Sequence, residues 1–314
     1  MAKNKVQFQK SISIQSFINK YGQEEQCQKQ LFNMRWPNGY KCPQCGKDKY
    51  CQLKTKTLYQ CNHCHHQSSL TAGTLFDHTK LPLTTWFMAI YFITQNKSGI
   101  SILELSRHLG ISYNATWRLK HKLMQAMKEW DDRKPLEGFI QLDDEYWGGV
   151  RRGSKGREAK GKSPFVAAVS LNDEMHPVGM RFSVVNGFQK KELTNWAKQH
   201  IKAKSVAVSD GLACFKGLGE AEIFHFSITT GGGADCVEIP YFKWVNAMIS
   251  NVKNSMHGTF HAINLKHLPR YLAEFSYRFN RRYNLKSMIE RLAFASLSTP
   301  PMPDRLLKLA ELRW

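Results

Sequence analysis

The sequence lacks a long hydrophobic run, since its longest uninterrupted apolar stretch extends only from Trp86 to Ile93. A membrane-spanning helix needs about 20 such residues, so integral membrane proteins are excluded. The opening residues, MAKNKVQFQK, also lack the apolar segment of a secretory signal. We therefore expect a cytoplasmic protein without a membrane partner. Its eight cysteines would then be metal ligands or free thiols rather than disulfides.

Acidic residues are scarce as well, because 45 Lys and Arg stand against 25 Asp and Glu, for a net charge of +20. This balance excludes an acidic scaffold and predicts attraction to a polyanion, usually nucleic acid. A soluble basic protein with a solvated charged surface is the alternative that charge alone leaves open. Hydrophobic residues make up 42% of the 314, so the chain can bury real cores.

Four cysteines form two Cys-x-x-Cys pairs, Cys42 with Cys45 and Cys61 with Cys64, and 15 residues separate the pairs. Thiolates at this spacing can close a tetrahedron around zinc, and Gly46 suits the turn after the first pair. With four ligands the site has no open position, so we expect a structural zinc that supplies folding free energy. Chance motifs and redox thiols are the alternatives. Three histidines are less favoured substitute ligands: His63, His65 and His66.

Residues 81–130 are predicted to be helical. Ser101 can cap a helix with Glu104 three residues later, and Gly110 can end that helix in the left-handed conformation. A second helix is predicted after Ser112. Two helices joined by such a turn predict a helix-turn-helix, with a plain helical bundle as the alternative. The second helix would contact DNA through side chains near its N-terminal end. These are Asn114, Thr116, Arg118 and Lys120.

From Gly138 onward the sequence predicts three strands, a helix, a strand, a short helix, a strand and a helix. The strands are expected at 139–144, 165–171, 178–185, 205–210 and 222–228, and the helices at 190–201, 211–218 and 244–256. This order is that of the RNase H-like fold. We therefore predict a multidomain α+β protein with a mixed-sheet core and C-terminal helices. The predicted parts are an arm (1–24), a zinc ribbon (25–75), a helix-turn-helix (81–130), the core (138–290) and a tail (291–314).

Two aspartates end strands that this element order makes neighbours in the sheet, Asp143 in the first and Asp210 in the fourth. Asn246 lies on the helix after the fifth strand, and Lys253 follows two helical turns later. Oxygen ligands of this kind suit two Mg²⁺ or Mn²⁺ ions, which support in-line displacement at phosphorus. Asp144 and Glu145 adjoin Asp143, and either one is an alternative ligand there.

Four motifs resemble those of insertion-sequence DDE-type transposases of the ISXO-like class, and the likeness covers roughly residues 15–312. They are LDDEYWGG from Leu142, SDG from Ser209, FKWVNAMISNVKNSMHGTFH from Phe242 and YLAEFSYRFNRR from Tyr271. The first three resemble the blocks that hold the family's metal ligands, so the resemblance implies Asp143, Asp210 and Asn246 as ligands. In the family the third ligand is Glu, Asn or His, with a lysine seven positions later, which implies a phosphate-binding role for Lys253.

An amide at the third position is a weaker ligand than a carboxylate, so an inactive copy is an alternative. Asp235 and Glu238 are the nearby substitutes for Asn246. The stretch from Arg151 to Lys162 holds six basic residues and one acidic residue, and it is predicted to be a mobile loop that clamps DNA. The basic residues assigned there to DNA are Arg151, Arg152 and Lys155, together with Lys253 on the later helix.

The resemblance implies a bacterial or archaeal, nucleoid-associated transposase. It would bind the inverted-repeat ends of its own element as a homo-oligomer on double-stranded DNA, cleave them and transfer a strand to target DNA. Two other functions remain open from the sequence. One is a zinc-ribbon DNA-binding regulator with a degenerate core, and the other is a nuclease or resolvase that cuts without joining.

Overall fold

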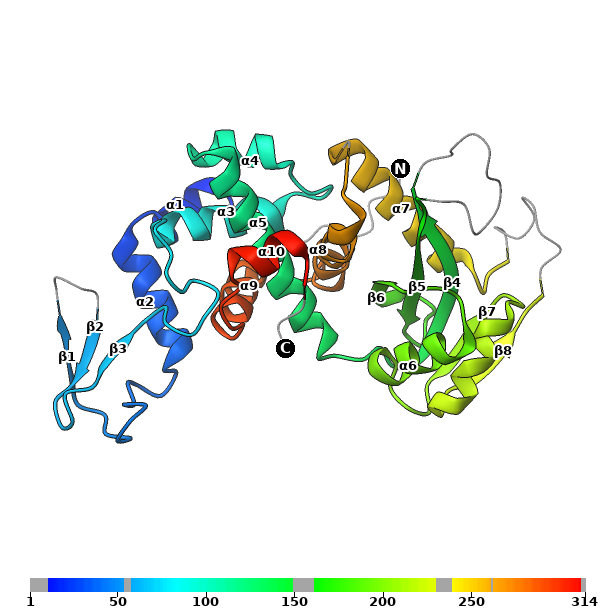
Figure 1. Cartoon of the computed structure of the whole chain (residues 1–314), viewed down its shortest axis with the longest axis horizontal. Helices are drawn as coiled ribbons and strands as arrows, with labels where there is room; N and C mark the ends of the chain where they lie inside the picture. Colours follow the sequence, from blue (N-terminus) through cyan, green and yellow to red (C-terminus); the bar gives the residue numbers. More distant parts are fainter. Residues whose placement is uncertain (1–10, 54–57, 149–160, 230–238, 261, 312–314) are drawn as a thin grey trace. The chain divides into compact units, whose positions relative to one another are not determined.

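The computed structural model describes residues 11–53, 58–148, 161–229, 239–260 and 262–311 (Figure 1). The chain divides into two compact units. Unit 1 comprises Met1–Met127 and Arg282–Trp314, and unit 2 comprises Lys128–Arg281. The division falls inside the long helix α5 (Tyr113–Asp132), so both units contain part of the same helix.

Unit 1 begins with two helices, α1 (Ile14–Tyr21) and α2 (Glu24–Arg35). The arm predicted for residues 1–24 therefore contains a helix, which Ser13 caps by accepting a hydrogen bond from the backbone N–H of Ser16. Phe17 and Tyr21 anchor this helix because both are fully buried. A polar-looking segment thus folds through two aromatic residues at helical spacing.

A small antiparallel sheet follows, built from β1 (Tyr50–Leu53), β2 (Leu58–Cys61) and β3 (Gln67–Ser69) in that order. Aromatic rings join α2 to this sheet, with Phe32 lying 5.0 Å from Tyr59 and Tyr40 lying 4.7 Å from Tyr50 between ring centroids. The ribbon therefore has an aromatic cluster in addition to its cysteines.

The rest of unit 1 is helical. The helices are α3 (Leu83–Gln95), α4 (Ile102–Leu109), the first part of α5, the 3₁₀ turn η4 (Leu285–Ser287), α9 (Met288–Leu297) and α10 (Asp304–Leu309). As predicted, Ser101 caps α4 and Gly110 ends it with φ of 64°. Helix α9 packs against α2 and α3, so the C-terminal segment completes the N-terminal core.

Unit 2 holds a five-stranded mixed sheet with the order β6-β5-β4-β7-β8. Its elements are β4 (Phe139–Trp147), β5 (Ser163–Leu171), β6 (Pro177–Val184), α6 (Lys190–His200), β7 (Val206–Ser209), η1 (Ala213–Ala221), β8 (Phe224–Ser227), α7 (Lys243–Thr259), η3 (Leu265–His267) and α8 (Leu268–Asn280). Strands β4, β5 and β6 are antiparallel, whereas β7 runs parallel to β4 and β8 parallel to β7. This is the topology of the RNase H-like fold, and it confirms the predicted fold class.

Helices cover both faces of the sheet. Even-numbered residues of β4, Ile140 and Leu142, pack into a core with α6 and η1 that includes Trp196 and Phe215. On the opposite face α7 packs against β4 and β5, and α8 packs against β6 (Figure 1). Side chains alternate along a strand, so the odd-numbered residues of β4, Asp143 among them, belong to the face that carries α7.

Candidate zinc site, DNA-binding helix and carboxylate centre

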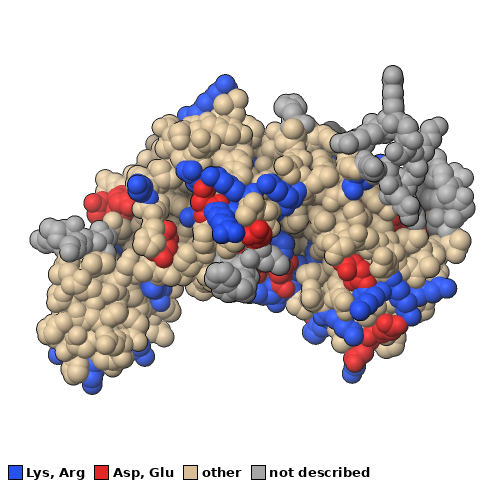
Figure 2. All heavy atoms as spheres, in the orientation of Figure 1, with Lys and Arg blue, Asp and Glu red and all other residues tan. Residues whose placement is uncertain are grey.

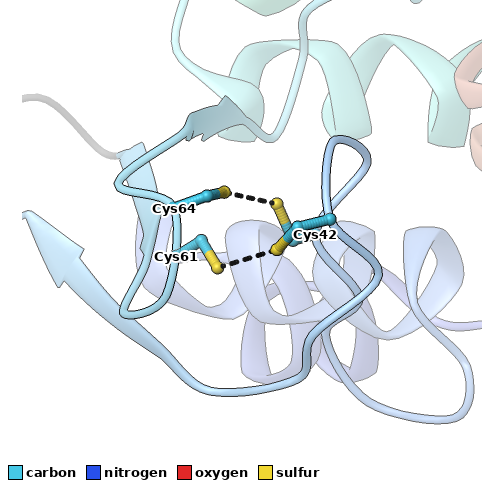
Figure 3. Close-up of side chains that lie close together, drawn as sticks. Cys42, Cys61 and Cys64 are labelled. Carbon is cyan, nitrogen blue, oxygen red and sulfur yellow. Dashed lines mark hydrogen bonds between the residues drawn. The ribbon is translucent and has the colours of Figure 1, made fainter.

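The four predicted zinc ligands come together at one point. The sulfur atoms of Cys42 and Cys64 lie 3.5 Å apart, and those of Cys45 and Cys61 lie 3.6 Å apart (Figure 3). Sulfurs bound to one zinc at about 2.3 Å form a tetrahedron with edges of about 3.8 Å, whereas a disulfide needs about 2.05 Å. The spacing therefore fits four thiolates around a zinc ion.

Both cysteine pairs adopt the same turn. The carbonyl of Cys42 accepts from the Gly46 N–H at 2.9 Å, and the carbonyl of Cys61 accepts from the His65 N–H at 3.0 Å. Gly46 and His65 both have positive φ, 72° and 59°. His65 thus holds the position that suits glycine in the first turn, and its side chain is exposed.

Hydrogen bonds within the cluster make the thiols unequal. Burial opposes ionisation of Cys42, but the backbone N–H groups of Cys45 and Gln44 and the neighbouring thiols lower its pKa to about 6. The Cys64 N–H lowers the pKa of Cys61. The His66 N–H favours the Cys64 thiolate, yet burial and the other three sulfurs outweigh it and raise its pKa to about 12. A cation is therefore needed to hold all four as thiolates.

The helix-turn-helix presents fewer of the predicted DNA-contacting side chains than the sequence suggested. Asn114 and Arg118 are exposed on α5, whereas Thr116 and Lys120 are fully buried. The Thr116 hydroxyl donates to the carbonyl of Ser112 at 3.0 Å. The prediction that Thr116 and Lys120 contact DNA is therefore wrong. Both lie on the buried stripe of the helix, one residue from the apolar positions that mark it.

Lys120 and Arg118 also have partners within unit 1. Lys120 donates from Nζ to the carbonyl of Ile100 at 2.6 Å, which ties α5 to the segment before α4. Arg118 forms an ion pair with Asp304 of α10 at 2.8 Å, and its side chain remains 49% exposed. Arg118 can therefore still reach an external ligand, but it must share its guanidinium with Asp304.

The carboxylate centre is built by β4 and β7. These parallel strands pair Phe139 with Val206 and Gln141 with Val208. Continued by two residues, the same register brings Asp143 level with Asp210. One carboxylate oxygen from each of Asp143, Asp144 and Asp210 lies within 4.8 Å of the other two. The two predicted aspartates therefore meet, and Asp144 joins them as a third carboxylate.

Burial and charge repulsion act together on Asp143. Burial is the largest effect, and the charges of Asp144, Asp210 and Glu145 add to it, although the Asp144 N–H donates to the Asp143 carboxylate at 2.8 Å. The result is a pKa of Asp143 raised to about 7. Without a cation, ionisation of Asp143 is unfavourable. Carboxylate oxygens are the ligands that Mg²⁺ and Mn²⁺ prefer. The donor set therefore fits a divalent metal.

Helix α7 is held against the same face of β4. The Gln141 side-chain oxygen accepts from the backbone N–H groups of Trp244 and Val245, each at 3.0 Å, at the start of the helix. Two turns further along, Lys253 forms an ion pair with Glu145 at 2.6 Å. Gln141 and Glu145 lie on the same face of β4, two residues before and two residues after Asp143, so these contacts hold the helix beside Asp143.

Asn246 occupies the side of α7 that faces β4. It lies two turns before Lys253 and therefore on the same face of the helix. His257, one turn after Lys253, stacks on Trp147 with 4.6 Å between ring centroids. Asn246 is half-buried, and its backbone position falls in the stretch of α7 between the Gln141 and Glu145 contacts. Its role as a metal ligand stays a prediction.

Several predicted residues lie outside the described part of the chain. These are Arg151, Arg152 and Lys155 of the basic stretch, and the substitute ligands Asp235 and Glu238. Among the described residues, Figure 2 shows Lys and Arg side chains in several groups, many with Asp or Glu beside them. The ion pairs of unit 2 include Lys190 with Glu220 at 2.6 Å and Lys202 with Glu137 at 2.7 Å. No helix in the described ranges is long and apolar enough to span a bilayer.

Comparisons with known proteins agree with this arrangement. The family model of the ISXO2-like transposase domain matches residues 135–280, and that of the transposase zinc-ribbon domain matches residues 22–67. A protein of Halobacterium salinarum, described as an uncharacterized protein in transposable element ISH50, is 30% identical over 150 residues. The match covers 47% of this chain and 47% of that protein, so the chain spans about half the length of this relative.

Solved structures with some similarity include the Mos1 transposase paired-end complex with left transposon end, at 10% identity and a TM-score of 0.21. That match covers 63% of this chain and 77% of the other. The Mos1 Strand Transfer Complex matches at 11% identity and the same TM-score, over 63% of this chain and 76% of the other. From the two family matches, the chain contains a transposase zinc-ribbon domain at residues 22–67 followed by an ISXO2-like transposase domain at residues 135–280.

Proposed function

We propose that this chain binds the ends of its own insertion sequence, cleaves them in a metal-dependent step and transfers a strand to target DNA. The observation that carries the proposal is the meeting of Asp143 and Asp210 at neighbouring strands, with carboxylate oxygens within 4.8 Å. Carboxylates that converge in this way repel one another unless a cation lies between them. The partner is double-stranded DNA, bound by a homo-oligomer in the nucleoid of a bacterial or archaeal cell.

The two metal sites are assigned different tasks. Cys42, Cys45, Cys61 and Cys64 would hold a structural zinc, since four thiolates leave no position for substrate. Asp143 and Asp210 would hold two Mg²⁺ or Mn²⁺ ions, with Asn246 as a neutral third ligand. Such a pair of ions, when bound, stabilises the attacking and leaving oxygens of an in-line displacement at phosphorus.

The proposed reaction has two steps, hydrolysis and strand transfer. In the first, a water oxygen bonds to the scissile phosphorus and the bond to the 3′ oxygen of the element breaks, leaving a 3′-OH. In the second, this 3′-OH attacks a target phosphorus and releases a target 3′-OH. Lys253 would position a phosphate after exchanging its contact with Glu145.

The third ligand can be decided by metal binding. Asn246→Ala and Asp144→Asn each remove one candidate oxygen without touching Asp143 or Asp210. If Asn246 is a ligand, the Mn²⁺ affinity measured by calorimetry falls in Asn246→Ala. Asp144→Asn lowers this affinity in either case, because it removes a negative charge from the cluster. An unchanged affinity in Asn246→Ala would assign the third position to Asp144, whose carboxylate already lies in the cluster.

Strand transfer tests the proposal against its two rivals. The full-length protein is incubated with Mg²⁺, a target plasmid and linear DNA that carries the sequences flanking its own gene. Joined products with short direct duplications of the target support a transposase. Cleaved ends without joined products indicate a nuclease or resolvase. Binding without any cleavage indicates a DNA-binding regulator with a degenerate core.

A further inference from the structure

Two phenylalanines project from the edge strand of the unit 2 sheet. Phe224 and Phe226 of β8 are each 60% exposed, more than any other large hydrophobic side chain among the described residues. They are two residues apart, so both point to the same face of the sheet. Apolar side chains that are grouped in solvent on one face are candidates for a binding surface.

This face is the one that carries the carboxylate centre. Phe226 pairs with Val208 of β7, which pairs with Gln141 of β4, and Gln141 lies two residues before Asp143. Directly paired residues of neighbouring strands point to the same side, so Phe226 and Asp143 share a face. Neighbouring strands lie about 4.8 Å apart, which puts β8 about 10 Å from β4. That separation corresponds to only a few nucleotides of a DNA strand.

The helices leave this part of the face open. Helix α7 packs against β4 and β5, and α8 packs against β6. Both helices thus lie over the β6-β5-β4 side of the sheet, whereas the rings on β8 are in solvent. A DNA strand with a phosphate at Asp143 and Asp210 can therefore extend over the β7-β8 side of the sheet.

We propose that Phe224 and Phe226 form a stacking platform for unpaired bases next to the scissile phosphate. This inference rests on the proposed function, because it takes the carboxylate centre to be where DNA is cut. A phenyl ring offers no hydrogen bond or charge to a phosphate, but it stacks on the face of any base. Base faces are hidden inside a paired duplex, so the platform selects DNA whose strands have separated at the cleavage site.

Binding of two matched DNAs tests the platform. One is a fully paired duplex, and the other has the same sequence with a three-nucleotide unpaired fork at one end. Each is titrated into the full-length protein at one fixed salt concentration, which is needed because phosphate contacts depend on salt. We expect the wild-type protein to prefer the fork. The double variant Phe224→Leu, Phe226→Leu keeps apolar volume but removes the rings, and should bind the fork about 5- to 150-fold more weakly, the range of one stacked base.

A matched control is available in unit 1. Phe294 of α9 is 40% exposed, and Phe294→Leu should leave the fork preference unchanged. A 2-aminopurine base in the fork should be quenched by the wild-type protein and by Phe226→Trp, but not by the double Leu variant. Because binding needs no cleavage, a catalytically dead core would fail the strand-transfer assay and still show the fork preference.

Three results would overturn the inference. The first is an equal affinity of the wild-type protein for both DNAs. The second is a double Leu variant with undiminished fork preference. The third is a variant that loses self-association in sedimentation and keeps its fork preference, which would assign the rings to contact with a second copy of the chain.

Discussion

Replacing Asp143 by Asn should stabilise unit 2 at pH 8 when divalent cations are absent. Asp143 is half-buried beside Asp144 and Asp210, and partial burial with the nearby negative charges raises its pKa to about 7. At pH 8 the folded protein must therefore keep an unfavourable charge in this position. An amide has nearly the same shape and no charge, so the substitution removes that cost.

The magnitude follows from the pKa shift. The ordinary value is 3.8, so the unfolded chain releases the proton near pH 4 while the folded chain keeps it until about pH 7. Between these values the folded state binds more protons, and the free energy of unfolding of the wild-type protein falls as pH rises. A shift of about three units corresponds to about 4 kcal/mol, an upper bound because the three carboxylates titrate together. The stabilisation by Asp143→Asn should thus vanish near pH 4 and be complete above pH 7.

Urea unfolding of the full-length protein at pH 5 and pH 8, in buffer freed of divalent cations, measures this effect. Hydrogen exchange of peptides from β4 and β5 reports on unit 2 apart from the zinc ribbon. The control is Asp173→Asn, which changes an exposed carboxylate in the turn between β5 and β6. Adding Mn²⁺ should reverse the order, because the wild-type centre then gains metal-binding free energy. A variant with the stability of the wild-type protein at both pH values would refute the reasoning.

Three further outcomes follow from the structure. One zinc per chain should be found by metal analysis, and acid or a chelator should release it and unfold the ribbon sheet in circular dichroism, because protonated thiols do not bind zinc. Lys120→Ala should lower the free energy of unfolding by about 1–3 kcal/mol, because the Ile100 carbonyl loses its donor, and it should leave element-end binding unchanged. Its counterpart Arg118→Ala should weaken element-end binding in gel shifts with little loss of stability. Arg181→Met should destabilise unit 2 in urea by about 1–3 kcal/mol, because it leaves the carbonyls of Asp131 and Lys134 without this donor and removes one of the two cationic partners of Asp132.

Most of unit 2 could be predicted from the sequence because its strands are bounded apolar runs and its helices are periodic. The β4 and β7 strands were expected in the right places, and so Asp143 and Asp210 were expected to meet. Asp144 adjoins Asp143 in sequence and is therefore an alternative ligand, but alternation along a strand predicts that the two side chains point to opposite faces. In the structure one oxygen of each nevertheless lies within 4.8 Å of the other and of an Asp210 oxygen.

Unit 1 was less predictable because its contacts join distant segments. Helix α9 packs against α2 and α3, whereas the predicted boundary between core (138–290) and tail (291–314) cuts through this helix. Lys120 can be buried because the carbonyl of Ile100, twenty residues earlier, accepts a hydrogen bond from its ammonium group, and the sequence gives no sign of this contact. Helix α1 did leave a signal in Ser13, Phe17 and Tyr21, a cap followed by two aromatic residues one turn apart.

A single-turnover assay tests most directly whether the carboxylate centre cleaves DNA. DNA that carries the sequences flanking the gene is incubated with excess full-length protein, with and without Mg²⁺, and the 3′ ends formed are mapped. The wild-type protein should cut at the element ends only with Mg²⁺. Asp143→Asn and Asp210→Asn should bind this DNA as tightly and cut it at least about 1,000-fold more slowly, since several kcal/mol of transition-state stabilisation are lost with the metal. Cleavage by either variant at the wild-type rate would contradict the account.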